Sequence, residues 1–250
     1  MRKHLFAVIA LLGVSLAASA QRIMKIEKTD GTVVEIPVTD ITRVFFEEPE
    51  PPEEPDEAVM AGLCPDNHHP HIIDLGSCGK WSCCNVGASS PEQYGSYYAW
   101  GETQLKSVYN SDTYQYYDSS LDYPDCYINI GSDISGTQYD AATANWGAPW
   151  RMPTFAECQA LLDNCTSEWT TVNGVNGRKF TGPNGGSIFL PAAGSRDGSS
   201  LSGQGSSGDY WSSSLYPSNS LGARYLYFNS GNAYASHCGR YYGQSVRPVR

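Results

Sequence analysis

Turn-forming residues interrupt residues 58–250 so often that long regular elements have little room there. Gly, Ser, Asn and Pro recur throughout this segment, while aromatic residues make up 12% of the whole chain and can fill a core. One helix is predicted, because Thr154 and Glu157 form a capping box, and Cys158 and Leu161 follow at helical spacing. We therefore predict an irregular α+β domain with short strands, one or two helices and long loops.

Strand and turn signals follow this helix. Residues 186–191 form a short apolar run that predicts a buried strand, and residues 224–228 predict another. The dipeptides Asn173-Gly174 and Asn176-Gly177 indicate a tight turn region, because Asn and Gly tolerate positive φ.

Residues 1–20 have the three parts of a secretory signal peptide. Arg2 and Lys3 give a basic start, residues 5–17 are apolar, and Ala-Ser-Ala at 18–20 is a small-residue cleavage site. A buried N-terminal helix is the weaker alternative. No cysteine follows the cleavage site, and no later run is long and apolar enough for a transmembrane segment. We expect an exported protein at the cell surface, in the periplasm or outside the cell.

Two short regions separate the signal peptide from the main domain. Residues 21–46 predict a small β unit, with a hairpin turn at Asp30-Gly31 and a third apolar segment at 41–46. Residues 47–57 contain only Glu, Asp and Pro, so they predict an extended acidic linker. A calcium cluster in the linker is disfavoured, because carboxylates separated by Pro cannot easily converge on one ion. The main domain then covers residues 58–250.

The cysteines leave two interpretations open, disulfides in an exported chain or several buried thiols. Adjacent Cys83 and Cys84 point apart in an extended segment, and Cys158 and Cys165 lie too far apart along one helix to pair. Any bonds are therefore long-range, and Cys84 to Cys165 is the pairing we predict. The chain has eight cysteines, at positions 64, 78, 83, 84, 126, 158, 165 and 238.

An ordered set of short motifs gives residues 62–250 a family resemblance. The motifs are Asp-Asn-His-His-Pro-His at 66–71, Asp-Leu-Gly at 74–76, Lys-Trp at 80–81, Asn-Val-Gly-Ala at 85–88, Tyr-Tyr-Ala-Trp-Gly-Glu-Thr at 97–103, Ala-Ala-Thr-Ala-Asn-Trp-Gly at 141–147, Trp-Arg-Met-Pro-Thr at 150–154, Ile-Phe-Leu-Pro-Ala-Ala-Gly at 188–194, Tyr-Trp-Ser-Ser-Ser at 210–214 and Ser-Val-Arg-Pro-Val at 245–249. In these motifs the chain resembles the exported Fibrobacter major paralogous domain family of Bacteroidales.

The resemblance implies both a fold and a C-terminal segment that is diversified. It implies an α+β domain similar to C-type lectin-like and formylglycine-generating-enzyme-like domains. Many members of this family are variable proteins of diversity-generating retroelements, in which adenine-directed mutagenesis of Asn codons diversifies a C-terminal segment. Here that segment is about 210–250. The surrounding frame is implied to stay fixed.

The composition of residues 215–243 agrees with that implication. Lys, Glu, Gln, Met and Trp are absent from this stretch. An AAC codon randomised at both adenines gives only codons ending in C, and no such codon encodes these five amino acids. The alternative is a Ser-, Gly- and Asn-rich loop region that lacks the same types by chance. The coding DNA distinguishes the two interpretations.

We predict a ligand-binding surface within this segment. Leu226 and Phe228 alternate with Tyr225 and Tyr227, so a strand would point one pair inward and the other outward. Tyr offers a large contact area with few rotatable bonds, and Ser, Gly and Asn add adaptable hydrogen bonds. One or two of the tyrosines are expected to pack into the core instead. The candidate ligand-binding and diversified residues are Tyr216, Asn219, Arg224, Tyr225, Tyr227, Asn229, Asn232, Tyr234, Ser236, His237, Tyr241 and Tyr242, with Cys238 as a further diversified position.

The expected partner is a protein or glycan ligand on another cell, a host or a phage. A net charge of −10 argues against nucleic acid and anionic membranes, because both need clustered Lys and Arg. We predict a binding protein of the adhesin or receptor type. The alternatives are an enzyme of the formylglycine-generating or glycan-processing group, and a structural subunit at the tip of a surface fibre.

Other chemistry has weaker support in the sequence, and we expect no catalytic site, metal or cofactor. His68, His69 and His71 are interpreted as a polar loop, because the Cys or His pair that a zinc site needs is missing. The calcium motifs of lectins are absent, and Cys238 lacks the neighbouring cysteine of formylglycine-generating enzymes. The side chains expected to be structural are the six tryptophans, in the core, and Arg151 and Arg247, as ion-pair or backbone-carbonyl partners.

Overall fold

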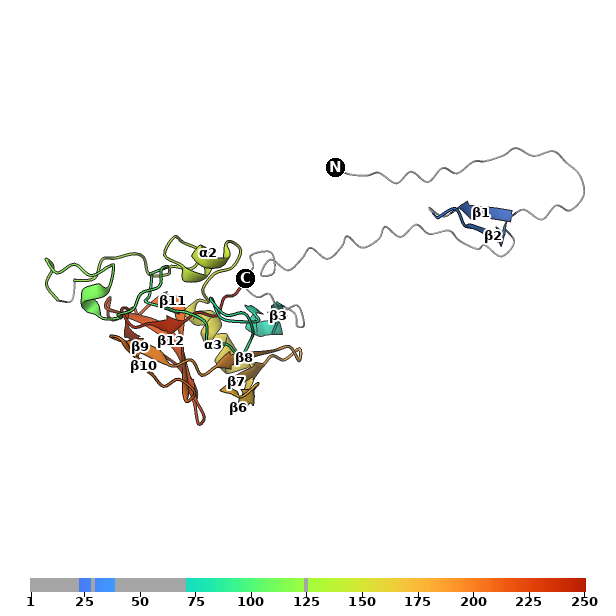
Figure 1. Cartoon of the computed structure of the whole chain (residues 1–250). Helices are drawn as coiled ribbons and strands as arrows, with labels where there is room; N and C mark the ends of the chain where they lie inside the picture. The colour runs from blue at the N-terminus through green and yellow to red at the C-terminus, as the bar shows by residue number, and fades with distance from the viewer. Residues whose placement is uncertain (1–22, 28–29, 39–70, 124–125) are drawn as a thin grey trace, which may run out of the picture. The chain divides into compact units, whose positions relative to one another are not determined.

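The structure is a computed structural model that describes residues 23–27, 30–38, 71–123 and 126–250. These residues belong to two units, one holding the hairpin and the other the main domain (Figure 1). The predicted signal peptide, the third apolar segment at 41–46 and the acidic linker all lie outside the described residues.

The first unit contains a β-hairpin. Strands β1 (Ile23–Glu27) and β2 (Val33–Pro37) pair antiparallel, with Met24 opposite Ile36 and Ile26 opposite Val34. The turn uses the predicted Asp30-Gly31 signal. Gly31 has a φ of 81°, and the carboxylate of Asp30 accepts a hydrogen bond from the Thr32 amide at 2.9 Å.

The main domain is built around a five-stranded sheet with the strand order β13-β12-β11-β14-β5. Strands β11, β12 and β13 form an antiparallel meander, while β14 runs parallel to β11 and returns the chain to the early strand β5. The strands of this sheet are β5 (Tyr97–Tyr98), β11 (Ser207–Leu215), β12 (Gly222–Asn229), β13 (Ala233–Gly239) and β14 (Gln244–Ser245).

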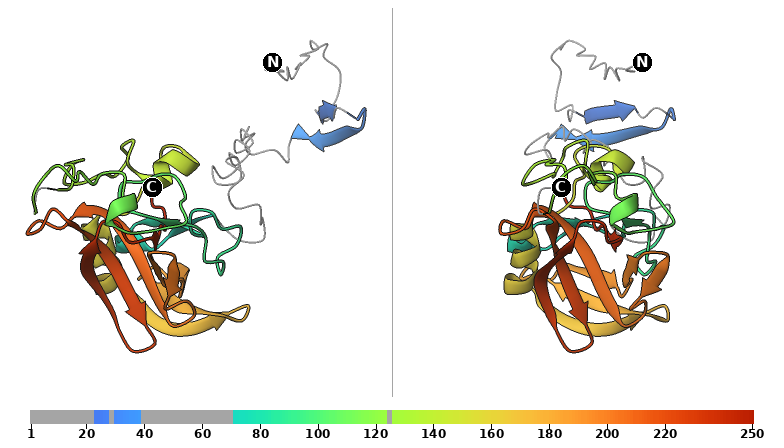
Figure 2. Two further views of the ribbon diagram at one scale, coloured as in Figure 1. Left: turned by 60° about the vertical axis from the view of Figure 1, so that its left-hand side comes forward. Right: turned by 90° about the vertical axis from the view of Figure 1, so that its left-hand side faces the viewer.

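A second sheet has the order β6-β7-β8 and lies beside the first (Figure 2). Its strands are β6 (Thr166–Val172), β7 (Val175–Thr181) and β8 (Ser187–Pro191), and β8 confirms the strand predicted at 186–191. Asn173 and Gly174, at φ 48° and 83°, form the turn between β6 and β7. Asn176-Gly177 was wrongly included in the turn region: it lies inside β7, where a side chain at Gly177 would meet the ring of Phe189.

The remaining elements are short, as the frequent turn residues predicted. Two α-helices occur among the residues described, and together with the sheets they establish the α+β class. These elements are β3 (Ile72–Asp74), η2 (Gly76–Cys78), β4 (Lys80–Ser82), η3 (Ser111–Thr113), α2 (Ala141–Trp146), α3 (Phe155–Asn164), β9 (Ser195–Asp197) and β10 (Ser200–Ser202).

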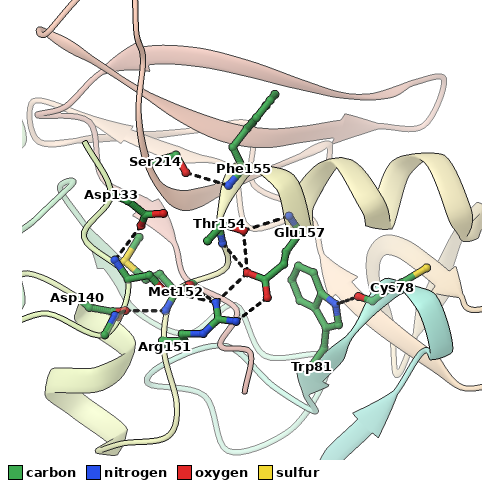
Figure 3. Close-up of polar contacts among 12 residues, drawn as sticks. Cys78, Trp81, Asp133, Asp140, Arg151, Met152, Thr154, Phe155, Glu157 and Ser214 are labelled. Atoms are coloured by element: carbon green, nitrogen blue, oxygen red, sulfur yellow. Dashed lines mark hydrogen bonds and ion pairs between the residues drawn. The ribbon is translucent and has the colours of Figure 1, made fainter. Parts of the chain in front are cut away.

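Helix α3 begins at the predicted capping box (Figure 3). Thr154 accepts a hydrogen bond from the Glu157 amide, and Glu157 accepts one from the Thr154 amide at 2.8 Å. The same carboxylate binds the guanidinium of Arg151 through two contacts of 2.6 and 2.7 Å. At the first residue of the helix, the Phe155 amide donates to the hydroxyl of Ser214 in β11 at 3.0 Å. The helix is therefore fixed to the central sheet.

Three apolar clusters make up the core of the main domain. Five of the six tryptophans are buried, as predicted, and Trp169 is half-buried against Phe228. One cluster surrounds Trp100, Trp150 and Trp211, a second surrounds Trp81 and Phe228, and a third is rich in tyrosine. The central sheet contributes side chains to all three clusters, so its register is fixed by the burial of these side chains.

The predicted disulfide between Cys84 and Cys165 is wrong. Cys165 pairs with Cys78, whose Cα lies 6.8 Å away across a sequence separation of 87 residues. Cys84 is buried in the cluster around Trp211, and its thiol contacts the carbonyl of Ala88. Chain geometry excluded neighbouring pairs but could not show that η2 brings Cys78 to the end of α3.

Replacing Cys78 and Cys165 by Ser is expected to lower the free energy of unfolding by about 2–4 kcal/mol, because the bond closes a long loop and restricts the unfolded chain. Urea denaturation under oxidising conditions measures the loss. Cys126→Ser removes a half-buried cysteine without a disulfide partner and serves as the control. Equal stability of the double variant and the control would contradict the assignment.

Candidate functional site

The C-terminal strands divide their side chains between the core and a second face of the sheet. In β12, Leu226 and Phe228 are 1% and 0% exposed, whereas the intervening Tyr225 and Tyr227 are half-buried. This confirms the alternation predicted for residues 224–228. Tyr225 also packs against the core cluster around Trp211, so the second face is partly buried.

Tyr225, Tyr227, Tyr234, Ser236 and Cys238 lie on this second face, which we call the tyrosine face. The register pairs Tyr225 with Ser236 and Tyr227 with Tyr234 across β12 and β13. The rings of Tyr227 and Tyr234 are 5.0 Å apart, and Tyr234 is 48% exposed. Cross-strand pairs therefore fix the relative positions of the aromatic rings.

Tyr225 packs against the core cluster around Trp211. Its ring lies edge-on to Trp211 at 6.1 Å, and burial raises the pKa of its hydroxyl, although a hydrogen bond with Ser236 opposes this. Tyr225 is therefore a tyrosine that packs inward, as was expected for one or two of them.

Tyr241 and Tyr242 follow β13 and extend the aromatic surface. Their rings stack at 4.5 Å, and the hydrogen bond between their hydroxyls, together with burial, raises the pKa of Tyr242. Asp197 in β9 and Cys238 of the tyrosine face raise the pKa of Tyr242 further. Both rings are half-buried, so each presents only part of its surface to solvent.

Tyr216, Arg224 and His237 form a separate cluster. Arg224 and His237 are paired across β12 and β13 and alternate with the residues of the tyrosine face. The rings of Tyr216 and His237 stack at 3.6 Å, and Arg224 lies 4.0 Å from the ring of Phe155 at the start of α3. The predicted site residues therefore occupy two faces of the sheet, and Tyr216 does not join the other tyrosines.

The candidate asparagines lie in turns. The side chain of Asn219 accepts a hydrogen bond from the Leu221 amide at 2.9 Å. In the turn between β12 and β13, Asn229 accepts from the amides of Gly231 and Asn232, both at 2.9 Å. Asn219 and Asn232 are exposed, and Asn229 is half-buried. Asn219 and Asn229 thus shape the loops that border the site.

Two buried arginines hold the segment in place. Arg240 is 1% exposed, donates to the hydroxyl of Tyr114 at 2.8 Å and lies 4.9 Å from the ring of Trp100. Arg247 is also 1% exposed and donates to three backbone carbonyls and to Asn85. The prediction that Arg247 binds backbone carbonyls is confirmed.

Asp209 and Gln244 border the tyrosine face and were missed in the sequence. Asp209 lies directly opposite Tyr227 in the β11–β12 register and is 8% exposed. Its hydrogen bond, from the hydroxyl of Ser207, measures 3.4 Å. Burial raises the pKa of Asp209 to about 6. The available signal was its place in β11, two residues before Trp211 and therefore on the same face of the strand.

Asp209→Asn is expected to stabilise the domain above pH 6. A buried acid with a raised pKa stabilises the fold while it is protonated, and that contribution is lost as pH rises from about 4 to about 6. A shift of about two pKa units corresponds to about 3 kcal/mol at pH 7. The free energy of unfolding, measured in urea from pH 4 to 8, should differ between variant and native chain by an amount that grows across this interval. A difference that is constant with pH would contradict the raised pKa.

The other predicted or possible sites do not coincide with the tyrosine face. His71 is 5% exposed and its Nδ1 lies 3.5 Å from the thiol of Cys83, while His68 and His69 fall outside the described residues. Within the described ranges, no three His, Cys, Asp or Glu side chains are grouped to hold a metal ion. A hollow of about 380 Å³ contains no predicted site residue; it is lined by Ile73, Cys83, Pro91, Val172, Lys179, Ser187, Ile188 and Phe189.

Fold and site together define an α+β domain with a tyrosine-lined sheet face in its C-terminal segment. Comparison with models of protein families, with curated proteins and with solved structures found no match. In the part of the chain that the structure describes, no helix has the length and apolar character needed to cross a membrane.

Proposed function

We propose that the chain is an exported binding protein that contacts its ligand through the tyrosine face and the adjoining Tyr241 and Tyr242. The observation that carries the proposal is the division of β12 between buried Leu226 and Phe228 and the half-buried Tyr225 and Tyr227. Tyr rings offer rigid contact area, and a neighbouring Ser supplies an adaptable hydrogen bond, which is the chemistry of antibody binding loops.

The same proposal includes the diversification of this surface by a retroelement. Its support is the composition of residues 215–243, the family resemblance of the motifs, and the positions of the candidate residues, none of which is buried. The coding DNA provides the test. A near-copy of the last coding bases beside a reverse transcriptase gene, differing at adenines alone, is expected. Differences spread over all four bases would contradict diversification.

Binding is tested by replacing Tyr225, Tyr227 and Tyr234 together with Ser. The labelled native chain and the triple variant are applied to a glycan array and to a panel of purified extracellular proteins. Ligand signals given by the native chain should disappear in the variant, while its circular dichroism spectrum remains that of a folded domain. Equal signals from the two chains, or no signal above background from the native chain, would contradict the proposal.

The enzyme alternative gains no support from Cys238. Its thiol lies 3.0 Å from the Nε2 of Gln244, and burial raises its pKa well above the usual value. A cysteine nucleophile acts as the thiolate, which is scarce at neutral pH when the pKa is raised. Binding is therefore the function that this geometry favours.

A further inference from the structure

The tyrosine face borders a carboxylate whose hydrogen bonding is incomplete. Asp209 is 8% exposed and, among the described residues, accepts one long hydrogen bond, from Ser207 at 3.4 Å. It lies opposite Tyr227, and its negative charge helps to raise the pKa values of Tyr225 and Cys238. A buried carboxylate normally accepts several short hydrogen bonds or pairs with a cation.

A second acceptor lies beside this carboxylate. The parallel register places Tyr210 next to Ser245, so Asp209 and Gln244 precede this pair on neighbouring strands and on the same face. Gln244 is 2% exposed. Its Nε2 contacts the thiol of Cys238 at 3.0 Å, whereas no donor from the described residues reaches its Oε1. The face thus combines a carboxylate with a buried amide oxygen that has no donor.

The nearby arginines are directed elsewhere. Arg224 packs on Phe155 on the other face of the sheet, and Arg196 lies over the ring of Tyr97 at 5.1 Å. Arg240 and Arg247 bind carbonyl oxygens in the interior. Among the described residues, none of the ion pairs involves Asp209. The face therefore offers a carboxylate and aromatic rings while lacking a cation of its own.

We propose that the tyrosine face binds an arginine side chain presented by a protein ligand, with the carboxylate of Asp209 as acceptor and the tyrosine rings as stacking partners. This inference rests on the proposed binding function and gives its ligand a chemistry. A guanidinium is planar, carries five N–H donors and stacks on aromatic rings, so it complements both the oxygens and the rings.

The charge of the chain supports the same partner. Residues 58–250 contain 15 Asp and Glu and 10 Lys and Arg, and this net charge of −5 attracts basic partners. Burial raises the pKa of Asp209 to about 6, so the carboxylate is ionised at neutral pH and becomes protonated in mild acid. The titratable side chains facing Asp209 are Tyr225, Tyr227 and Cys238. The pKa values of Tyr225 and Cys238 are raised, so both stay neutral near pH 7.

The test uses the full chain and two peptides that differ in charge. Gly-Arg-Gly is titrated against Gly-citrulline-Gly, whose side chain has nearly the same shape but no charge, and binding is followed by NMR shifts of the backbone amides. Gly-Arg-Gly should shift amides of β11, β12 and β13 around Asp209. Gly-citrulline-Gly should bind at least tenfold more weakly. Affinity for Gly-Arg-Gly should also fall between pH 7.5 and pH 5.

Two variants localise the effect. Asp209→Asn should weaken Gly-Arg-Gly at least tenfold although the variant is more stable than the native chain, which separates loss of binding from loss of folding. Asp112→Asn removes one exposed negative charge in η3 and should leave the affinity unchanged.

Different outcomes would contradict the arginine proposal and the proposed binding function. Equal binding of the two peptides, or an Asp209→Asn variant that binds Gly-Arg-Gly like the native chain, would overturn the arginine proposal. Such a result leaves the array comparison of the triple Ser variant to decide the binding function separately. If the triple variant keeps every array signal, the binding function itself fails.

Discussion

Arg247→Ala is expected to lower the free energy of unfolding by about 4 kcal/mol or more, because it leaves several buried acceptors without donors. In the native chain the guanidinium donates to the carbonyls of Ser82, Cys83 and Phe189 at 3.1, 2.6 and 2.9 Å, and to the side chain of Asn85 at 2.8 Å. These contacts join the C-terminal segment to β4, to the residues that follow β4, and to β8 of the second sheet. Thermal unfolding followed by near-UV circular dichroism measures the loss.

Two further variants show whether the loss of stability is specific to the hydrogen bonds of Arg247. Arg247→Lys keeps the positive charge but not the fork of donors, and it should lose most of the same stability. Arg250→Ala changes an exposed arginine three residues away and should alter the free energy of unfolding by less than about 1 kcal/mol. If Arg247→Ala and Arg250→Ala have equal stabilities, Arg247 is not the anchor of the segment.

Phe228→Ala is expected to destabilise the domain by about 3–5 kcal/mol, whereas Tyr227→Ala at the adjacent position should change stability by about 1 kcal/mol or less. Phe228 is fully buried, and its ring contacts Trp169, Phe180 and Tyr210. Tyr227 is half-buried on the tyrosine face, where its ring packs against Tyr234 and its hydroxyl accepts a hydrogen bond from the side chain of Asn229 at 3.2 Å. Urea titrations of the two variants give both values under the same conditions.

The contrast between these neighbours tests the division of β12. The effect on ligand affinity should not follow the effect on stability. Tyr227→Ala should lose affinity for the ligand while the domain stays folded. Similar losses of stability at both positions would mean that the tyrosines are part of the core. The face could then not vary independently of the frame.

Local signals predicted the local structure well. The capping box at Thr154 and Glu157 gives the first turn of α3, because both partners lie within one turn of chain. Asn173-Gly174 supplies the positive φ values of a two-residue hairpin. Asn176-Gly177 has the same composition but lies in β7, where Gly177 is needed because the carbonyl of Leu190 and the ring of Phe189 leave no room for a side chain.

The features that the sequence did not show depend on long-range pairing. Cys78 meets Cys165 because η2 packs against α3, and the spacing of the cysteines in the sequence does not predict that contact. Asp209 and Gln244 come together because β14 pairs parallel with β11. The separation of Tyr216 from Tyr225 follows from the register of β12 with β13, in which Arg224 and His237 face the side of α3.

The most direct test of a fixed frame with an exchangeable surface compares two display libraries. Both use codons ending in C with the first two bases randomised, and the fraction of clones that resist protease measures folding. The surface library varies Tyr225, Tyr227, Tyr234, Ser236, His237, Tyr241 and Tyr242. The frame library varies Trp211, Ala223, Leu226, Phe228, Gly243, Val246 and Arg247. The account predicts that many surface clones resist protease like the native chain and that almost no frame clones do; equal resistant fractions in the two libraries would contradict it.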